Sequence, residues 1–279
     1  MALIGSTDGK GGVRVMRIKK GGLLREMREI EVTAMLIGGF DAAHTQQGNA
    51  PVVPTDTVEQ VINIVAQENR GLDSEDFCQA VAARFLEYYP QVETVTVQGL
   101  DTEWTRMSIK GGPHPRSFVL DCNGQPFTGV FATRAETNVV SGICGLTFAK
   151  SKESGWDRYH EADDPSITET GERMCASAME ASWLWGGAPV DYSAANTKIL
   201  ATMLEVFATT CSDNVRDKLY RMGTAALAAV PEIAEASLTC SDRHQSPIDL
   251  RSFGLASEGA MLLPTDEPHG HIECTVGRD

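Results

Sequence analysis

A chain of 279 residues, 42% of them hydrophobic, is long enough to bury one large core or two smaller ones. The formal net charge of −14 argues against a nucleic-acid partner, because phosphate backbones need a basic surface. No apolar run approaches the roughly 18 residues of a membrane span, and the chain has neither a nucleotide-binding glycine loop nor a metalloprotease motif.

The cysteines and the N-terminus indicate in which cellular compartment the protein is expected. The seven cysteines occur singly, without a CxxC pair, at Cys78, Cys122, Cys144, Cys175, Cys211, Cys240 and Cys274. This spacing argues against a zinc site or a disulfide framework and predicts reduced, mostly buried thiols. The first residues lack the long apolar segment of a signal peptide. We therefore expect a cytoplasmic protein.

The first half of the chain predicts strands, then two helices, then strands. The first strand, at 13–20, alternates apolar and basic side chains, as a half-exposed strand does. Its expected inward residues are Val13, Val15 and Ile18, and its expected outward residues are Arg14, Arg17 and Lys19. The other expected elements are a strand at 23–37, helices that begin near Thr57 and at Ser74, and strands at 92–98, 103–109 and 116–121.

The first of these helices begins with residues suited to an anion. Thr57 can cap it and Gln60, three residues later, can reach back, which is the pattern of a capping box. Its apolar stripe is Val58, Val61, Ile62 and Val65, with Glu59 and Asn63 left for water. Free backbone N–H groups and the positive end of the helix dipole place the Thr55 hydroxyl and the Asp56 amide where a small anionic ligand could be held. An ordinary capped helix explains the same residues.

From about residue 125 the order of elements recurs. Strands are expected at 127–140 and 145–150, helices at 194–209 and 213–230, and strands at 233–239 and 271–276. Residues 151–170 are irregular, and periodicity alone does not decide between strand and helix at 173–185. Read coarsely, with the short additional segments set aside, each half has two strands, two helices and two strands, which indicates an internal duplication.

Five short motifs are spread along the chain. They are Gly9-Lys10-Gly11-Gly12-Val13-Arg14-Val15, the run from Gly48 to Thr57, Trp104-Thr105-Arg106-Met107, Ser141-Gly142-Ile143-Cys144-Gly145-Leu146, and Ile272-Glu273-Cys274-Thr275-Val276-Gly277-Arg278. In this order they resemble the urate oxidase (uricase) family, over nearly the whole chain. The resemblance favours a strand at 173–185. It implies an α+β fold of two tandem tunnelling-fold (ββααββ) units, at 1–123 and 124–279, each an antiparallel sheet with helices on one face.

The implied fold leaves open sheet edges, and unpaired edges invite pairing with another chain. Uricases close their sheets into a barrel through a dimer and stack two dimers. The resemblance therefore implies a homotetramer with active sites at subunit contacts. The chain ends at Gly277-Arg278-Asp279 rather than in the Ser-Lys-Leu signal of peroxisomal proteins, which fits a bacterial cytoplasmic protein.

The resemblance also implies an oxidase that uses O2 as co-substrate, without metal or flavin, and releases hydrogen peroxide. In that family a lysine on the first strand, a threonine at a helix start and a late histidine form a proton relay. The matching residues here are Lys10, Thr55 and His244. A hydroxyl needs a neighbouring amine or imidazole to act as an acid or base. Taken singly, the three are also explained as a turn lysine, a turn threonine and a polar-loop histidine.

Three further positions match the purine-binding residues of the family. Arg173 corresponds to an arginine that grips the pyrimidine edge, Ile167 to an apolar wall, and Val215 to a residue that offers its backbone. An arginine that donates two hydrogen bonds to one acceptor group binds about twice as strongly as a neutral donor. The resemblance thus implies a flat, hydrogen-bonded heterocycle as the substrate.

Three substrate-facing positions depart from the family pattern. Trp156 replaces a stacking phenylalanine, Arg216 a gripping glutamine, and Asp242 an asparagine above the ring. A guanidinium only donates, so a urate N–H facing Arg216 would lack an acceptor, which costs about 1–3 kcal/mol. This favours a related purine-like bicyclic heterocycle, or urate in a different ionisation state, unless Arg216 and Asp242 form an internal salt bridge.

Two other functions are compatible with the chain. One is a tunnelling-fold hydrolase or lyase acting on a pterin- or purine-like ring. Such enzymes usually carry a zinc site, and His269-Gly270-His271 comes nearest to one, without a partner cysteine. The other is a non-catalytic binding homologue. The relay residues together favour the oxidase, and we expect no metal site.

Overall fold

The computed structural model describes residues 3, 5–19, 26–40, 43, 52–150, 175–210, 214–243, 245–248, 250–255, 261–264 and 270–278. The chain divides into two compact units, Met1–Ile143 with Leu184–Ala194 and Cys144–Trp183 with Ala195–Asp279. None of the described helices is both long and apolar enough to cross a membrane.

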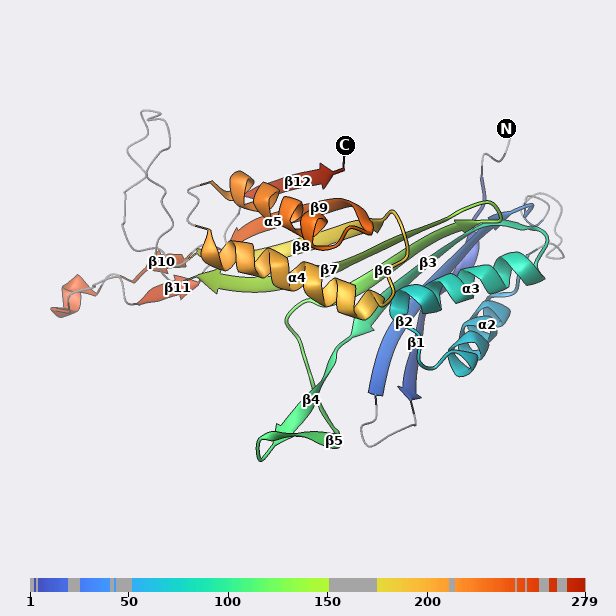
Figure 1. Cartoon of the computed structure of the whole chain (residues 1–279), viewed down its shortest axis with the longest axis horizontal. Helices are drawn as coiled ribbons and strands as arrows, with labels where there is room; N and C mark the ends of the chain where they lie inside the picture. Colours follow the sequence, from blue (N-terminus) through green and yellow to red (C-terminus); the bar gives the residue numbers. More distant parts are fainter. Residues whose placement is uncertain are drawn as a thin grey trace. The chain divides into compact units, whose positions relative to one another are not determined.

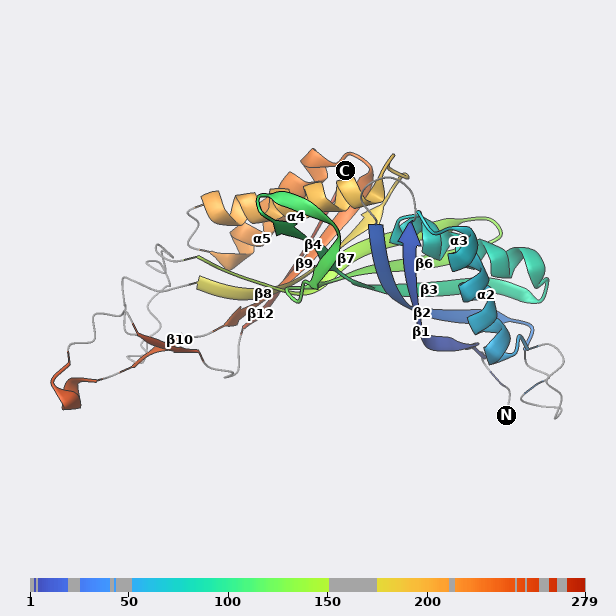
Figure 2. The same ribbon diagram turned by 90° about the horizontal axis from the view of Figure 1, so that it is seen from below.

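The first unit is an antiparallel sheet covered by two helices. Its elements are β1 (Asp8–Lys19), β2 (Glu26–Gly38), α2 (Thr55–Glu68), α3 (Ser74–Tyr88), β3 (Val92–Thr102), β4 (Trp104–Ile109), β5 (Gly112–Leu120), β6 (Gln125–Thr133) and the start of β7 (Thr137–Lys150). The strands lie in the order β1-β2-β3-β6-β7, and the first three pairs are antiparallel. The helices α2 and α3 cover one face of these strands (Figures 1 and 2).

Apolar side chains from the sheet and from α2 build the core of this unit. The buried residues of β2 alternate along the strand and are Ile30, Val32, Ala34 and Leu36. The buried residues of α2 include the predicted stripe of Val58, Val61, Ile62 and Val65, which is thus confirmed. Burial of side chains of this size contributes roughly 1.5–3 kcal/mol each. Apolar packing therefore holds α2 in place.

The second unit repeats this order of elements. Its elements are the remainder of β7, most of β8 (Cys175–Trp185) and α4 (Tyr192–Thr209), then α5 (Val215–Ala229), β9 (Ile233–Arg243), β10 (Gln245–Pro247), the 3-10 helix η1 (Arg251–Phe253), β11 (Leu262–Pro264) and β12 (His271–Gly277). The strands lie in the order β7-β8-β9-β12, with α4 and α5 on one face (Figure 1). The predicted order of two strands, two helices and two strands in each half is confirmed, and so is a strand at β8.

A two-stranded sheet interrupts each unit between its third and fourth strands. In the first unit β4 pairs with β5, and in the second β10 pairs with β11, both antiparallel. The two insertions occupy equivalent places in the element order, which strengthens the case for an internal duplication. The division of the repeat at 123/124 stays a prediction.

The predicted capping box of α2 is wrong. The helix begins at Thr55, and the residue before it is Pro54, which makes no side-chain capping hydrogen bond. The Pro54 carbonyl accepts the N–H groups of Thr57 and Val58 at 2.9 and 3.0 Å, so both residues already lie inside the first turn. The fixed φ of proline, here −56°, suits the residue that leads into a helix.

Two further local predictions are corrected. The break between β6 and β7 lies at 134–136 rather than at 141–144. There the N–H of Thr133 donates to the Glu136 carbonyl at 2.8 Å and closes a turn. Fewer thiols are buried than the spacing of the cysteines predicted, since Cys122 and Cys144 are exposed.

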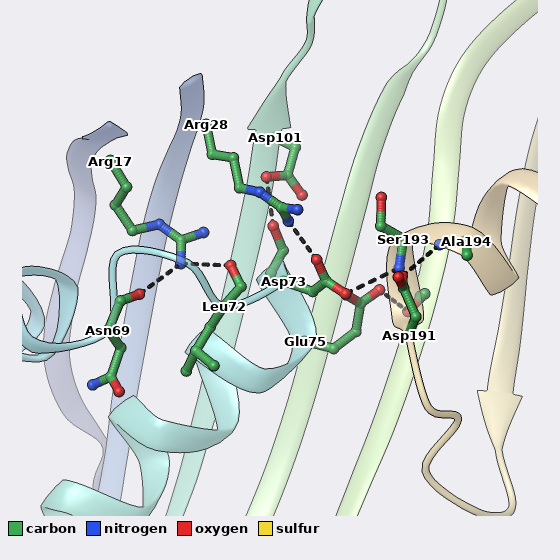
Figure 3. Close-up of polar contacts among 12 residues, drawn as sticks. Arg17, Arg28, Asn69, Leu72, Asp73, Glu75, Asp101, Asp191, Ser193 and Ala194 are labelled. Atoms are coloured by element: carbon green, nitrogen blue, oxygen red, sulfur yellow. Dashed lines mark hydrogen bonds and ion pairs between the residues drawn. The ribbon is translucent and has the colours of Figure 1, made fainter. Parts of the chain in front are cut away.

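Arg17 is buried rather than directed outward. Val13 and Arg17 are both buried on β1, because alternate residues of a strand share a face. The Arg17 guanidinium donates to the carbonyls of Asn69 and Leu72 at 3.4 and 2.9 Å (Figure 3) and lies 4.3 Å from the centroid of the Phe77 ring. Burial lowers the pKa of Arg17 below its usual value. Arg17 thus fastens the loop between α2 and α3 to β1.

Carboxylates near Arg17 join the start of α3 to the sheet (Figure 3). The Ser74 hydroxyl donates to Oδ1 of Asp101 at 2.6 Å, and Arg28 pairs with Asp73 at 2.5 Å. Burial raises the pKa of Asp101 to about 6, and the neighbouring Glu75 carboxylate adds to the rise. The hydrogen bond from Ser74 opposes it. Asp101 is therefore a carboxyl whose charge is costly to keep in the folded protein.

Candidate active site

A bulge among glycines presents Lys10 on β1. The register with β2 shifts between Lys10 and Val13, because β1 carries one extra residue there. Gly12 within the bulge has a φ of 71°, a left-handed conformation that favours glycine. A bulge bends its strand and re-aims the side chain beside it. The glycines that flank Lys10 in the sequence thus serve its placement.

The amine of Lys10 faces the first turn of α2. Its Nζ lies 3.3 Å from Oε2 of Glu59 and 3.7 Å from Oδ1 of Asp56. Because Thr55 is the first residue of α2, and α2 packs against β1, Lys10 and Thr55 reach the same helix end from distant parts of the sequence. The side chain of Lys10 is one-third exposed, at 33%, so the site is open to a ligand.

Opposite charges meet at this helix end. The first N–H groups of α2 have no acceptor within the helix, and the helix dipole makes this end positive. An anion is therefore favoured beside Thr55 and Asp56, both of which are exposed. The ammonium of Lys10 adds to the positive charge, while the carboxylates of Asp56 and Glu59 offset it. The arrangement can hold a small anion and move a proton next to it.

Val215 and Arg216 begin helix α5 in the second unit. The helix is capped by Asn214, whose side-chain oxygen accepts the N–H of Arg216 at 2.9 Å. The Arg216 side chain is exposed, and it starts from the positive end of α5. These two residues therefore also stand at a helix N-terminus open to solvent.

Other predicted site residues fall outside what the structure describes. They are Trp156, Ile167, Arg173 and His244, and of Asp242 only its place on β9 is described. The structure thus brings together Lys10, Thr55 and Asp56 in the first unit. It places Val215 and Arg216 side by side in the second. That the two sets belong to one site stays a prediction.

Glu59 also belongs to this helix end, although its place outside the apolar stripe of α2 predicted a side chain that faces only solvent. Asp56 and Glu59 are three residues apart, so they lie on one face of α2. That spacing was the available signal, but it does not say which strand the face meets. The structure supplies this information, since the face meets β1 at Lys10.

The predicted metal-ligand pair can be followed in part. His271 lies on β12 with its Nε2 3.1 Å from Oε1 of Glu273, whereas His269 falls outside the described residues. Within the described ranges, no group of three or more His, Cys, Asp or Glu side chains could hold a metal ion.

These features define a tunnelling-fold protein with a lysine and a threonine gathered at a helix start. Solved structures show the same architecture. The crystal structure of uricase from Arthrobacter globiformis matches with a TM-score of 0.88 at 27% identity, over 100% of this chain and 96% of that chain. The predicted fold class, two tandem tunnelling-fold units with antiparallel sheets and helices on one face, is confirmed.

Sequence comparisons agree over the full length. The Uricase family model matches residues 6–130 and 139–273. A uricase of Cyberlindnera jadinii is 29% identical over 99% of this chain and 97% of that protein, and one of Aspergillus flavus is 28% identical over 97% of this chain and 95% of that protein. The chain belongs to the uricase family and is an oxidoreductase of that family. The resemblance predicted from the five motifs is confirmed.

Proposed function

We propose that this protein oxidises urate with O2, without a metal or flavin, and releases hydrogen peroxide. The observation that supports this most directly is the approach of the Lys10 amine to the first turn of α2, where Thr55 begins the helix. Membership of the uricase family supports the same reaction.

The proton relay has three members. The Thr55 hydroxyl exchanges a proton with the purine ring, the Lys10 amine exchanges it with Thr55, and His244 completes the relay. The amine is needed because a hydroxyl alone is too weak an acid or base. Loss of protons makes the ring electron-rich. O2 then takes two electrons and two protons from urate and leaves as hydrogen peroxide.

The substrate is held as a flat anion. The free N–H groups at the start of α2, including that of Asp56, bind its anionic edge. Arg173 grips the pyrimidine edge, Trp156 stacks on the ring, and Ile167 and the backbone of Val215 complete the pocket. The first-turn position of Asp56 and the position of Val215 at the start of α5 support these roles.

The choice of urate follows from the relatives. Arg216 and Asp242 favour a related heterocycle on hydrogen-bonding grounds, but the relatives described above are named uricases. Urate is therefore the first substrate to test, with Arg216 and Asp242 paired to each other or to the substrate. The hydrolase, the lyase and the non-catalytic alternatives are not favoured by these relatives.

The proposed assembly is a homotetramer in the cytoplasm. In the strand order of each unit, β1 ends the first and β12 ends the second, so each unit has a strand edge that another copy can extend. Closure of a barrel between copies would supply the residues of one unit to the site of another subunit. Light scattering on the purified protein tests this, and a monomer would contradict it.

The test of function is the loss of urate absorbance with purified protein. Wild type is expected to consume urate and O2 together. Thr55→Ala is expected to reduce kcat at least about 100-fold, since proton transfer by a positioned group contributes roughly 10²–10⁴-fold, and to spare binding. Thr57→Ala is the matched control, because Thr57 lies on the same turn. Absence of urate turnover by wild type, or full activity of Thr55→Ala, would overturn the proposal.

A further inference from the structure

We propose that Glu59 is a positioning residue that holds the Lys10 amine against the first turn of α2, so that the amine reaches the Thr55 hydroxyl. The proposal rests on the proposed function, because Lys10 and Thr55 are its relay. Its basis is a contact: Oε2 of Glu59 lies 3.3 Å from Nζ of Lys10.

The position of Lys10 calls for a restraint. Its side chain has four rotatable bonds and projects from a bulge whose next residues, Gly11 and Gly12, have no side chains to hold it. It also points at the positive end of α2, which repels an ammonium. Without a carboxylate there, the amine would turn away from Thr55 into solvent.

Glu59 is better placed than Asp56 to supply that carboxylate. The Glu59 side chain is 47% exposed and its oxygen lies closer to the amine, whereas the Asp56 side chain is 89% exposed and lies at 3.7 Å. Solvent screens the more exposed pair more strongly. Asp56 also stands where its N–H is needed by the substrate, so the two acidic residues have separate tasks.

The expected effect is on catalysis rather than on substrate binding. Small misplacements of a catalytic group are costly in rate, and the groups proposed to bind the purine do not include Glu59. Glu59→Gln should therefore lower kcat about 10-fold and change KM less than about 2-fold, as expected when a general acid or base loses its placement. Glu59→Asp keeps the charge on a side chain one methylene shorter and should recover part of the loss.

Glu68→Gln is the matched control. Glu68 is the last residue of the same helix and pairs with Arg84 at 2.5 Å, so its replacement also removes a surface ion pair of α2. It lies at the opposite end from Lys10 and should leave kcat unchanged. If Glu68→Gln lowered kcat as much as Glu59→Gln does, the effect would belong to helix stability and the proposal would be wrong.

A second readout does not depend on urate turnover. Reductive methylation, followed by peptide mass spectrometry, gives the labelling rate of Lys10 relative to Lys110, which lies exposed in the turn between β4 and β5. An amine held by a carboxylate reacts more slowly, so Glu59→Gln should raise this ratio and Glu68→Gln should not.

The two readouts separate the failures. An unchanged labelling ratio in Glu59→Gln overturns the proposal, whatever the enzyme does with urate. A raised ratio with unchanged kcat overturns it too, because the ion pair would then have no part in catalysis. Wild-type protein without urate turnover contradicts the proposed function, and the labelling ratio still decides whether Glu59 holds Lys10.

Discussion

Replacement of Asp101 by Asn should stabilise the protein at neutral pH. Burial raises the pKa of Asp101 from 3.8 to about 6, so at neutral pH the folded protein carries a charge that its surroundings disfavour. Asn has the shape of the protonated carboxyl, and its side-chain oxygen can still accept the hydrogen bond from Ser74. The substitution removes the unfavourable charge and keeps the contact.

The magnitude follows from the same pKa. A rise from 3.8 to about 6 corresponds to about 3 kcal/mol between the two protonation states. Because Asp101 keeps some contact with solvent, screening reduces the expected gain to about 1–2 kcal/mol. The folded-state pKa lies above the unfolded value, so the stability provided by the protonated carboxyl is fully present below about pH 4 and is lost as the pH rises through about 6.

Urea unfolding followed by tryptophan fluorescence, at fixed protein concentration, measures this. Asp101→Asn should unfold at higher urea concentration than wild type at about pH 7.5, and the gap should close towards about pH 4.5. Glu93→Gln is the control, because Glu93 is an exposed carboxylate on β3, the strand that also carries Asp101, and its replacement should leave the pH dependence unchanged. A gap between Asp101→Asn and wild type that stays constant across this range would refute the reasoning.

Three other substitutions test separate parts of the structure. Gly9→Ala would place a methyl group against the backbone carbonyl of Ala34 on β2 and should lower the free energy of unfolding by about 1–3 kcal/mol. Gly5→Ala is the control, because the space around Gly5 is open. Equal urea midpoints for the two variants would contradict this prediction. Trp185→Phe removes the N–H that donates to the Ser141 hydroxyl at 2.8 Å and also makes a buried ring smaller, so it should lower the free energy of unfolding by at least about 1 kcal/mol in the same assay. An unchanged midpoint would contradict this. Arg216→Gln restores an acceptor and should raise kcat/KM for urate about 10-fold; a fall would indicate that the guanidinium itself binds the substrate.

Local pattern was enough to predict most elements. The apolar stripe of α2 has the helical period and gave both the correct element and the correct face. The strand expected at 23–37 corresponds to β2, whose buried residues alternate along the strand. Periodicity did not decide between strand and helix for β8. Its Trp183 and Met179 are both buried and alternate along a strand, but their spacing also fits one face of a helix.

The charge of an arginine side chain was a poor predictor of its exposure on β1. Arg17 follows Val13 and Val15 in strict alternation, yet its charge led to an outward prediction. The structure buries it beside the Phe77 ring, where its Nη1 donates to the carbonyls of Asn69 and Leu72, while Nε and Nη2 make no hydrogen bond with the described residues. Those carbonyls belong to a loop far along the chain, so no local pattern could reveal them.

Only some of the residues at the helix end of the candidate site were predicted from the sequence. The motifs around Lys10 and Thr55 identified residues that the fold brings to one helix end. Glu59 was missed, because its partner comes from β1 and depends on how α2 packs against that strand. Residues whose role depends on long-range packing need coordinates, whereas residues in a family motif can be found from the sequence.

The most direct measurement is the stoichiometry of urate and O2 consumption by protein stripped of metals with a chelator and dialysed. We predict equal molar losses of urate and O2, an equal yield of hydrogen peroxide, and no change in rate when metal ions or flavin are added back. Urate turnover without O2 uptake, or turnover that appears only with added metal or flavin, would contradict cofactor-independent oxidation by O2.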